Sequence, residues 1–293
     1  MCRFTIYVGP PVRIASLLTE PTHSLIHQSF HSEERSEPLN GDGFGVGWYA
    51  PRLTPDPAIF RAIHPAWNDR NLKSIARVVT SPCILAHVRA ASAGSEVNLA
   101  NCHPFAHRQY LLMHNGHVGD FRRVRRRLLE GLSDEAFDVV RGSTDTEHVF
   151  AAFIDEVLRA PADGQDATLA LARCLSAALA RVLRQVRDDG DGEPSFLNIA
   201  VADGTHAVVT RFADDPNEGP ESLYLLRGEL YEPAGRRFPQ RRPDDEGEPF
   251  LVSSERLTDD ARWEEVPANH AVLLDRWGPV RVLPMSVTGE LEM

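Results

Sequence analysis

Cys2, near the beginning of the chain, is the residue whose chemistry stands out first. The sequence begins MCRFTIYVGP, and Cys2 is small enough for an aminopeptidase to remove Met1 in front of it. Removal of Met1 would leave a thiol and a free α-amine on one residue. A thiolate is a nucleophile that needs a base, and a free α-amine has a pKa of about 7.7 to 8.0. A cysteine in this position can also be an inert packed side chain, so other motifs must decide between the two roles.

Three further motifs carry groups that suit an amino-acid amide as ligand. Arg89 ends a predicted strand, and its planar guanidinium suits a carboxylate, although a surface salt bridge is its more ordinary role. Asn115 and Gly116 end the next strand, where an amide and a backbone N–H could form an oxyanion hole, or simply a hairpin turn. Asp145 begins a predicted helix, where it could bind an ammonium group or only favour the helix dipole. An ammonium, a carboxylate and a cleavable amide occur together in glutamine.

The elements that must position these groups begin with a strand directly after Cys2. Phe4, Ile6 and Val8 alternate with less apolar neighbours, which is the pattern of a half-buried strand. Helical patterns are expected near residues 12–18 and 72–79. Further strands are expected at residues 44–49, 58–63, 83–90 and 109–114.

The second half of the chain predicts longer helices followed by strands. One helix covers residues 121–129, and a third amphipathic pattern runs over 167–186. Between them a helix begins at STDTEH, where Ser143 or Thr144 can cap it and Glu147 can complete a capping box. The strands that follow are SFLNIAVAD and THAVVTRF, joined through a hairpin at Asp-Gly, and then SLYLLR, FLVSS, HAVLLDR and PVRVLPM.

This order of strands, helices and strands predicts an α+β fold in which two sheets lie between helical layers. The chain has 293 residues, of which 42% are hydrophobic, so it can bury a sizeable core. We expect a single domain over residues 2–286. The segment 232–249 is rich in Pro, Arg and Asp, which predicts a surface loop insertion.

Charge and cysteine content argue against several classes of protein. The formal net charge of −11 does not suit a protein that grips nucleic acid or an anionic membrane. The four cysteines stand far apart without a CxxC pair, which predicts neither a disulfide framework nor a thiolate zinc site. The sequence shows no leader pattern and no apolar stretch long enough to cross a bilayer, so we expect a cytoplasmic protein.

Several motifs together resemble those of the class II glutamine amidotransferases, which are N-terminal nucleophile hydrolases. They occur in the family's order and span most of the chain: MCRF, NGDGFGVGWY, AHVRAAS, NCHPF, MHNG and STDTE. The segments PTHSLIHQSF, HPAWNDRNL and VSSERLT resemble the branch that contains the amidotransferase-like subunit of a cytosolic glutathione-degrading complex. The chain is more distantly similar to the ergothioneine-pathway hydrolase that removes a γ-glutamyl group from a sulfoxide.

The resemblance implies a fold and a role for each matching residue. The implied fold is a four-layer αββα sandwich with two mainly antiparallel sheets. Cys2 is implied as the nucleophile, with its α-amine as the base, and the oxyanion donors are Asn115 and Gly116. The residues implied to bind the glutamyl carboxylate and amine are Arg89, Ser92 and Asp145. The positions implied to support the site from behind are Asp42, Gly43 and His87.

The implied reaction is attack of the thiolate on a γ-glutamyl carbonyl, departure of the amine, and hydrolysis of a γ-glutamyl thioester by water. It needs no metal and no organic cofactor. The substrate would be glutamine or a γ-glutamyl peptide or amine such as glutathione. Alternatively, the chain is a glutaminase subunit that delivers ammonia to a separate synthase. The implied partners are therefore a small γ-glutamyl molecule and either a separate peptidase-like or synthase subunit or a second copy of the chain.

Two other classes of function have to be weighed. A zinc-dependent hydrolase is suggested by Cys102, His103, His107, His114 and His117, but their spacing matches no metal signature and no HExxH motif is present. A nucleic-acid-binding module is suggested by the arginines at positions 122, 123, 125, 126 and 127. No aromatic platform accompanies these arginines, and the chain is acidic, which favours a solvated face or a protein contact.

Overall fold

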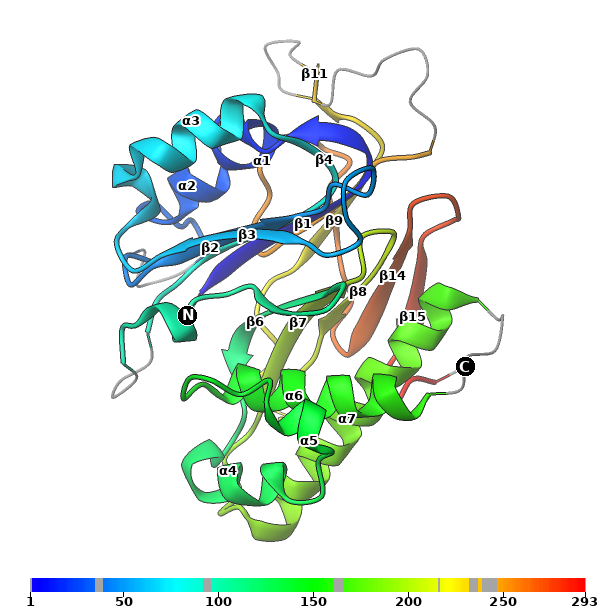
Figure 1. The fold of residues 1–293 in the computed structure, drawn as a ribbon. Coiled ribbons are helices and arrows are strands. Elements are labelled where there is room, and N and C mark those ends of the chain that lie inside the picture. Colours follow the sequence, from blue (N-terminus) through cyan, green and yellow to red (C-terminus); the bar gives the residue numbers. More distant parts are fainter. Residues whose placement is uncertain are drawn as a thin grey trace.

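The computed structural model describes residues 2–34, 39–91, 96–160, 166–215, 217–231, 237–238 and 247–292. Within these residues two antiparallel sheets lie face to face between two layers of helices (Figure 1). This is the four-layer αββα arrangement that the resemblance implies, and the α+β prediction is confirmed.

The first sheet contains seven strands, and the first strand of the chain lies at its centre. Their order across the sheet is β13-β9-β12-β1-β4-β2-β3, and every neighbouring pair is antiparallel. The strands are β1 (Arg3–Arg13), β2 (Phe44–Trp48), β3 (Ala58–Ala62), β4 (Thr80–Val88), β9 (Tyr224–Arg227), β12 (Phe250–Ser253) and β13 (Glu264–Glu265).

The second sheet contains six antiparallel strands in the order β15-β14-β8-β7-β6-β5. They are β5 (Phe105–His107), β6 (Tyr110–His117), β7 (Phe196–Ala202), β8 (His206–Arg211), β14 (His270–Asp275) and β15 (Arg281–Pro284). Two short strands, β10 (Leu230–Tyr231) and β11 (Arg237–Phe238), pair with each other separately. Most of the surface loop expected at residues 232–249 lies outside the described residues.

Helices cover the outer face of each sheet (Figure 1). The first sheet is covered by α1 (Ala15–Leu18), α2 (Leu25–Gln28) and α3 (Arg70–Val78). The second sheet is covered by α4 (Phe121–Leu129), α5 (Asp134–Phe137), α6 (Asp145–Arg159) and α7 (Ala167–Asp189). Single 3-10 turns are η1 (Ala66–Asn68) and η2 (Leu99–Asn101). None of the helices in the described part of the chain combines the length and the apolar character that a transmembrane segment requires.

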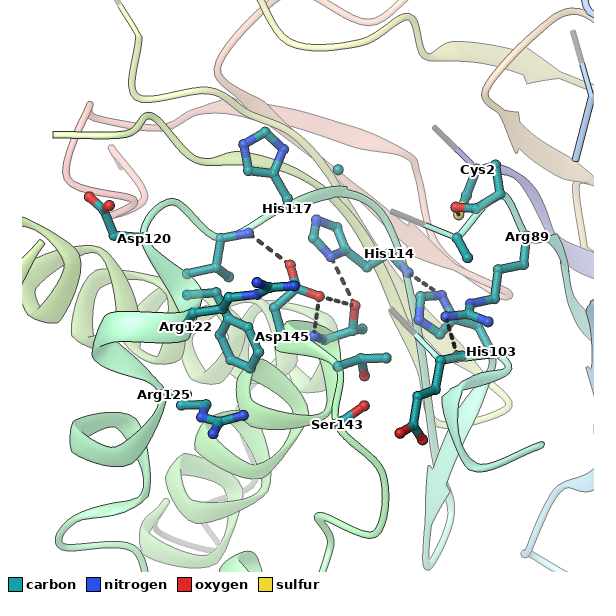
Figure 2. A pocket seen from close by; sticks show the side chains of 18 of the residues that line it. Cys2, Arg89, His103, His114, His117, Asp120, Arg122, Arg125, Ser143 and Asp145 are labelled. Carbon is teal, nitrogen blue, oxygen red and sulfur yellow. Dashed lines mark hydrogen bonds between the residues drawn. The ribbon is translucent and has the colours of Figure 1, made fainter. Parts of the chain in front are cut away.

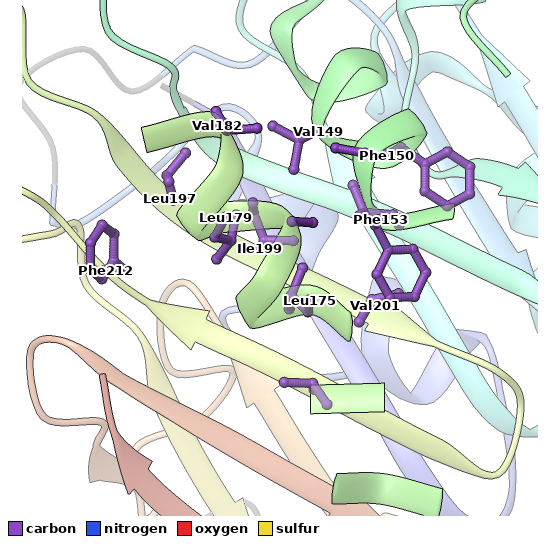
Figure 3. Close-up of a cluster of buried hydrophobic side chains, with 14 of the residues drawn as sticks. Val149, Phe150, Phe153, Leu175, Leu179, Val182, Leu197, Ile199, Val201 and Phe212 are labelled. Carbon is purple, nitrogen blue, oxygen red and sulfur yellow. The ribbon is translucent and has the colours of Figure 1, made fainter. Parts of the chain in front are cut away.

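Three apolar clusters fill the spaces between these four layers. The cluster between the sheets includes Phe4, Ile6 and Val8 of β1 together with Leu111 and Met113 of β6. A second cluster fills the space between the first sheet and α1–α3. The third joins the second sheet to α6 and α7, with Phe150, Phe153 and Leu179 at its centre (Figure 3). Because both sheets are covered on both faces, their central strands are buried all round.

The strand after Cys2 is therefore more deeply buried than the sequence predicts. A half-buried strand was expected from the alternation in β1, but Thr5 and Tyr7 are as inaccessible as Phe4 and Ile6. Phe4 and Ile6 face the second sheet, whereas Tyr7 packs in the cluster beneath the helices of the first layer. The helix expected at residues 12–18 is also mostly wrong, because β1 continues to Arg13 and α1 has only four residues.

The helix that begins at STDTEH has the predicted capping box. The Thr144 side chain accepts a hydrogen bond from the Glu147 N–H, and the Glu147 carboxylate accepts one from the Thr144 N–H. The predicted helix at residues 121–129 is also present with the same bounds. The hairpin interpretation of Asn115-Gly116 is wrong, since both residues lie within β6 and pair with Asn198 and Leu197 of β7.

Candidate active site

A cavity of about 950 Å³ lies where the start of β1 and the ends of β4 and β6 meet the first turns of α4 and α6 (Figure 2). Its wall contains four of the residues to which the resemblance assigns a role in the site, namely Cys2, Arg89, Gly116 and Asp145. The predicted residues that do not form part of this wall are Asn115, Asp42, Gly43 and His87. Ser92 lies outside the described residues.

Cys2 is half-buried and immediately precedes β1. Its Sγ donates a hydrogen bond to the carbonyl of Ala90 over 3.6 Å. Burial raises the pKa of the Cys2 thiol to about 11, although the positive charges of Arg89 and Arg3 act in the opposite direction. At neutral pH the thiol is therefore protonated, and a reaction through the thiolate needs a base that removes this proton.

Arg3 fixes the backbone next to the thiol, and sequence reasoning assigned it no role. Its side chain is fully buried, donates to the carbonyl of Cys2 over 3.0 Å, and pairs with Glu255 over 2.6 Å. Burial opposes the charge on Glu255, but a hydrogen bond from Ser32 and the charge of Arg3 hold the pKa of this carboxyl below its usual value. Arg3 lies in the MCRF motif and Glu255 in the VSSERLT motif. The signal available in the sequence was a charged Arg within an otherwise apolar strand, which needs a partner if the strand is buried.

Arg89 directly follows β4, and its side chain is 4% exposed. Its Nη2 donates to the carbonyl of Glu96 over 3.1 Å. The neighbouring segment holds the Arg89 backbone in place, because Arg89 N–H donates to Gly43 O and Asp42 N–H donates to Arg89 O. The Asp42 carboxylate also accepts a hydrogen bond from the N–H of Ala91 over 2.8 Å. Asp42 and Gly43 thus contact the backbone that carries Arg89.

Asn115 and Gly116 lie side by side near the end of β6. Asn115 is fully buried, and neither polar atom of its amide has a hydrogen-bond partner among the described residues. Buried amides rarely lack partners, so this group calls for an explanation. Gly116 has a φ of +143°, and an added Cβ would lie 1.8 Å from the carbonyl oxygen of Phe196. No other residue type fits at position 116 in this backbone.

Asp145 is the first residue of α6, and its carboxylate is already oriented by the backbone. One oxygen accepts from the N–H of Val118 over 2.8 Å, and the other accepts from the N–H of Thr146 over 2.8 Å. The carboxylate remains partly exposed in the wall of the cavity. Arg89 and Asp145 therefore provide opposite charges on one cavity wall with Cys2 (Figure 2).

Asn101 connects the segment after Arg89 with the segment before Asp145, and it was also missed by sequence reasoning. This fully buried side chain donates to the carbonyl of Glu96 over 3.0 Å and accepts from the N–H of Ser143 over 3.0 Å. The carbonyl of Glu96 also accepts a hydrogen bond from the Arg89 guanidinium. The Asn101 amide therefore links the segment that contacts Arg89 to the segment that precedes Asp145. Its place in the NCHPF motif was the only signal in the sequence.

Three buried histidines join β4 to β6, and of these His103 and His114 contribute to the cavity wall whereas His87 does not. His87 Nε2 lies 3.1 Å from the carbonyl oxygen of His114 and 3.1 Å from Nδ1 of His103. The N–H of His114 donates to the same Nδ1 of His103 over 3.3 Å. Burial lowers the pKa of His87 to about 3, so this ring is neutral at physiological pH. These contacts pin the strand immediately before Asn115.

The residues that suggested a zinc site point to separate partners. His107 pairs with Glu135, His114 with Thr146 and the carbonyl of Phe196, and Cys102 contacts two backbone carbonyls. Within the part of the chain that the structure describes, no group of three or more His, Cys, Asp or Glu side chains could hold a metal ion.

Comparisons with known proteins point to one family. A family model described as class-II glutamine amidotransferases matches residues 16–289. The chain is 36% identical to the probable glutamine amidotransferase DUG3 of Saccharomyces cerevisiae, over 94% of this chain and 82% of that protein. It is 25% identical to the gamma-glutamyl-hercynylcysteine sulfoxide hydrolase of Mycobacterium tuberculosis, over 95% of this chain and 94% of that protein.

Solved structures agree with this comparison. A glutamine aminotransferase class-II domain protein from Silicibacter pomeroyi superposes with a TM-score of 0.64 at 26% identity, over 97% of this chain and 100% of that chain. The glutamine phosphoribosylpyrophosphate amidotransferase of Bacillus subtilis superposes with a TM-score of 0.57, over 98% of this chain and 49% of that chain. Because its identity is only 13%, the second likeness concerns the fold alone.

The ion pair behind Cys2 should be worth much more than an exposed pair on the same strand. Arg3→Met leaves the buried Glu255 carboxylate without its cation, and we expect the free energy of unfolding to fall by about 3 to 5 kcal/mol. Arg13→Met is the matched control, because Arg13 pairs with Glu20 at the other end of β1 with 45% of its side chain exposed. The Arg13→Met substitution should lower the free energy of unfolding by less than about 1 kcal/mol. Urea unfolding measures both, and equal losses would contradict the proposed importance of burial.

His87 should make the protein less stable as the pH falls. Its folded pKa of about 3 lies below the ordinary value of 6.5, so only the unfolded chain takes up a proton between these values. The free energy of unfolding should therefore fall below about pH 6.5, by up to about 1.4 kcal/mol per pH unit for this group. In His87→Gln, the loss in free energy of unfolding per pH unit between about pH 6.5 and 5 should be smaller by up to about 1.4 kcal/mol.

The control for this experiment is the exposed His31→Gln, which should keep the slope of the wild-type protein. Urea unfolding at a series of pH values gives the three slopes. The assignment to His87 is wrong if the His87→Gln protein loses stability with acid as steeply as the wild type does.

Proposed function

The chain belongs to the class II glutamine amidotransferase family of enzymes, and from this premise we propose that it hydrolyses a γ-glutamyl amide through a thioester on Cys2. The observation that carries the proposal is the shared cavity wall, which unites the thiol with Arg89, Gly116 and Asp145. A nucleophile, a cation and an anion within one cavity match a γ-glutamyl amide, whose α-carbon bears both charges and whose side chain ends in the scissile bond.

The base in this proposal is the α-amine of Cys2 after removal of Met1. With a thiol pKa of about 11, very little thiolate forms unaided at neutral pH. A free α-amine with a pKa of about 7.7 to 8.0 is unprotonated in roughly a tenth to a sixth of the molecules at pH 7, and this fraction can accept the thiol proton. It lies on the same residue, so transfer needs no second side chain. The proton can then be given to the departing amine.

The oxyanion of the tetrahedral intermediate is proposed to be stabilised by the Asn115 amide and the Gly116 N–H. The support for this role is the Asn115 amide, which is buried without a hydrogen-bond partner among the described residues. Its side chain does not form part of the cavity wall, so the amide has to turn toward the substrate on binding. Catalytic hydrogen bonds commonly tighten only in the complex with substrate.

Arg89 and Asp145 are proposed to hold the glutamyl α-carboxylate and α-ammonium. Both charges are oriented by backbone contacts before any ligand arrives, which lowers the entropic cost of binding. Ser92 is proposed to assist at the carboxylate. Asp42, Gly43 and His87 are proposed to support Arg89 and β6 from behind, in keeping with their contacts.

The two relatives support a γ-glutamyl substrate, because one is a probable glutamine amidotransferase and the other a gamma-glutamyl-hercynylcysteine sulfoxide hydrolase. We propose hydrolysis of glutamine or of a γ-glutamyl peptide in the cytosol, with a separate protein subunit or a second copy as partner. The alternative is a glutaminase subunit that passes ammonia to a separate synthase, which the name of the yeast relative favours.

Replacement of the nucleophile tests the proposal. Cys2→Ala should reduce glutamate release from glutamine, glutathione and other γ-glutamyl amides to background, because no other group can form the thioester. Cys174→Ala is the control, since Cys174 lies on α7 and does not contribute to the cavity wall. Mass spectrometry of the wild type should show loss of Met1 and, after acid quenching, a γ-glutamyl adduct on Cys2. Full activity of Cys2→Ala, or of protein that retains Met1, would refute the mechanism.

Removal of the oxyanion donor should lower the rate without abolishing binding. In Asn115→Ala we expect kcat to fall by about 10² to 10³, equivalent to about 2.7 to 4 kcal/mol, with a smaller change in KM. Asn71→Ala on the exposed face of α3 is the control and should behave as wild type. Circular dichroism checks that both variants are folded. An unchanged kcat in folded Asn115→Ala would exclude the amide from the oxyanion site.

A further inference from the structure

Helix α4 carries five arginines, and three of them already have ionic or hydrogen-bond partners. Arg123 pairs with Asp191 over 3.2 Å, and its Nε donates to the backbone carbonyl of Asp189, the last residue of α7. Arg126 and Arg127 both pair with Glu130, at 3.9 and 2.9 Å. The charges of these three side chains are therefore already engaged by neighbouring groups of the protein.

Arg122 and Arg125 differ from the other three in having no ionic or hydrogen-bond partner among the described residues, although Arg123 also contributes to the cavity wall. They stand three residues apart, so their side chains share one face of α4, and both contribute to the wall of the cavity that contains Cys2 (Figure 2). Within the described residues neither guanidinium takes part in an ion pair or a hydrogen bond. Two cations thus face one cavity without an ion-pair partner among the described residues, in a chain of formal net charge −11.

Four acidic residues share this wall, and each accepts hydrogen bonds from groups other than these two arginines. Glu96 accepts one from the side-chain amide of Asn98 over 3.2 Å. The carboxylate of Asp120 accepts hydrogen bonds from the three backbone N–H groups of residues 191–193. Glu193 accepts from the N–H of Asp120 over 2.8 Å, and Asp145 accepts from Val118 and Thr146. The unpaired charges of Arg122 and Arg125 are therefore available for an anionic group that enters from solution.

We propose that Arg122 and Arg125 bind a carboxylate on the leaving amine, so that the enzyme prefers γ-glutamyl amino acids and peptides with a free terminal carboxylate to glutamine. This inference rests on the proposed function. The glutamyl residue has a single carboxylate, which is assigned to Arg89, so a second cationic position requires a second anion. In a γ-glutamyl peptide that anion belongs to the amine that leaves.

The size of the cavity agrees with a substrate larger than glutamine. At about 950 Å³ it is at the upper end of the range for small-molecule sites, and it extends from Cys2 past Asp145 to α4. A guanidinium presents several donors in one plane and binds carboxylates with two parallel hydrogen bonds. Two such groups on one helix face can select for charge at the end of the leaving group without contacting the scissile bond.

The test compares substrates that differ only in that charge. γ-Glutamyl-alanine and γ-glutamyl-alanyl-glycine are each assayed against the corresponding C-terminal amide. For at least one length, the wild type should show a kcat/KM about tenfold or more higher for the carboxylate than for the amide, as a charge-assisted hydrogen bond allows. Rising salt concentration should reduce this preference, since the arginines are exposed.

In the variant Arg122→Gln/Arg125→Gln, kcat/KM for the carboxylate substrate should become about equal to kcat/KM for the matching amide. The value for the amides themselves should change by no more than about twofold. The control, Arg126→Gln/Arg127→Gln, removes the same charge from the outer face of α4 and should keep the wild-type ratio. Thermal unfolding confirms that both variants are folded.

Three results would overturn the inference. The first is a wild type that cleaves carboxylate and amide equally at both lengths. The second is a preference that survives in Arg122→Gln/Arg125→Gln, as expected if these arginines instead contact an acidic partner protein. The third is an equal loss of activity toward all substrates in that variant. If the wild type cleaves no γ-glutamyl amide at all, the proposed function fails, which is distinct from failure of the anion site.

Discussion

Burial of the first strand is the constraint on which the rest of the structure depends. Chain ends usually fray, because few contacts hold them. Here β1 lies between β12 and β4 at the centre of a sheet whose two faces are both covered. Pairing with β4 begins at Arg3, directly after Cys2, so the thiol has a defined place relative to Arg89. The reaction proposed for Cys2 requires that this thiol be held in such a defined place.

The same burial creates two electrostatic problems, which the surrounding residues solve differently. A guanidinium at position 3 would be very costly in the interior without a partner, and Glu255 and Ser32 neutralise it and satisfy its hydrogen bonds. The thiol of Cys2 is harder to ionise in its surroundings, which raises its pKa to about 11. The proposed α-amine base addresses this second problem. The position of Cys2 and the raised pKa of its thiol thus both follow from burial.

The charged groups that face Cys2 come from segments that are distant in the sequence. Arg89 follows β4, and Asp145 begins α6, yet Asn101 is hydrogen-bonded to both connecting segments. The cavity continues past Asp145 to α4, where the guanidinium groups of Arg122 and Arg125 have no ionic or hydrogen-bond partner among the described residues. Preorganised charges at one end and unpaired charges at the other fit a ligand that is charged at both ends. This arrangement is the basis for the proposed preference for peptide substrates.

The sequence by itself determined what depends on local chemistry and on repeating patterns. The capping box at Thr144 and Glu147 and the extent of α4 could be predicted, because each is encoded within a few neighbouring residues. The α+β class followed from the order of such local elements, and the family resemblance from the order of short motifs along the chain. Tertiary structure alone decided burial on the second face of β1, the continuation of β6 through Asn115, and the connections made by Arg3 and Asn101. These features depend on contacts between residues far apart in the chain, and neither periodicity nor turn preference contains that information.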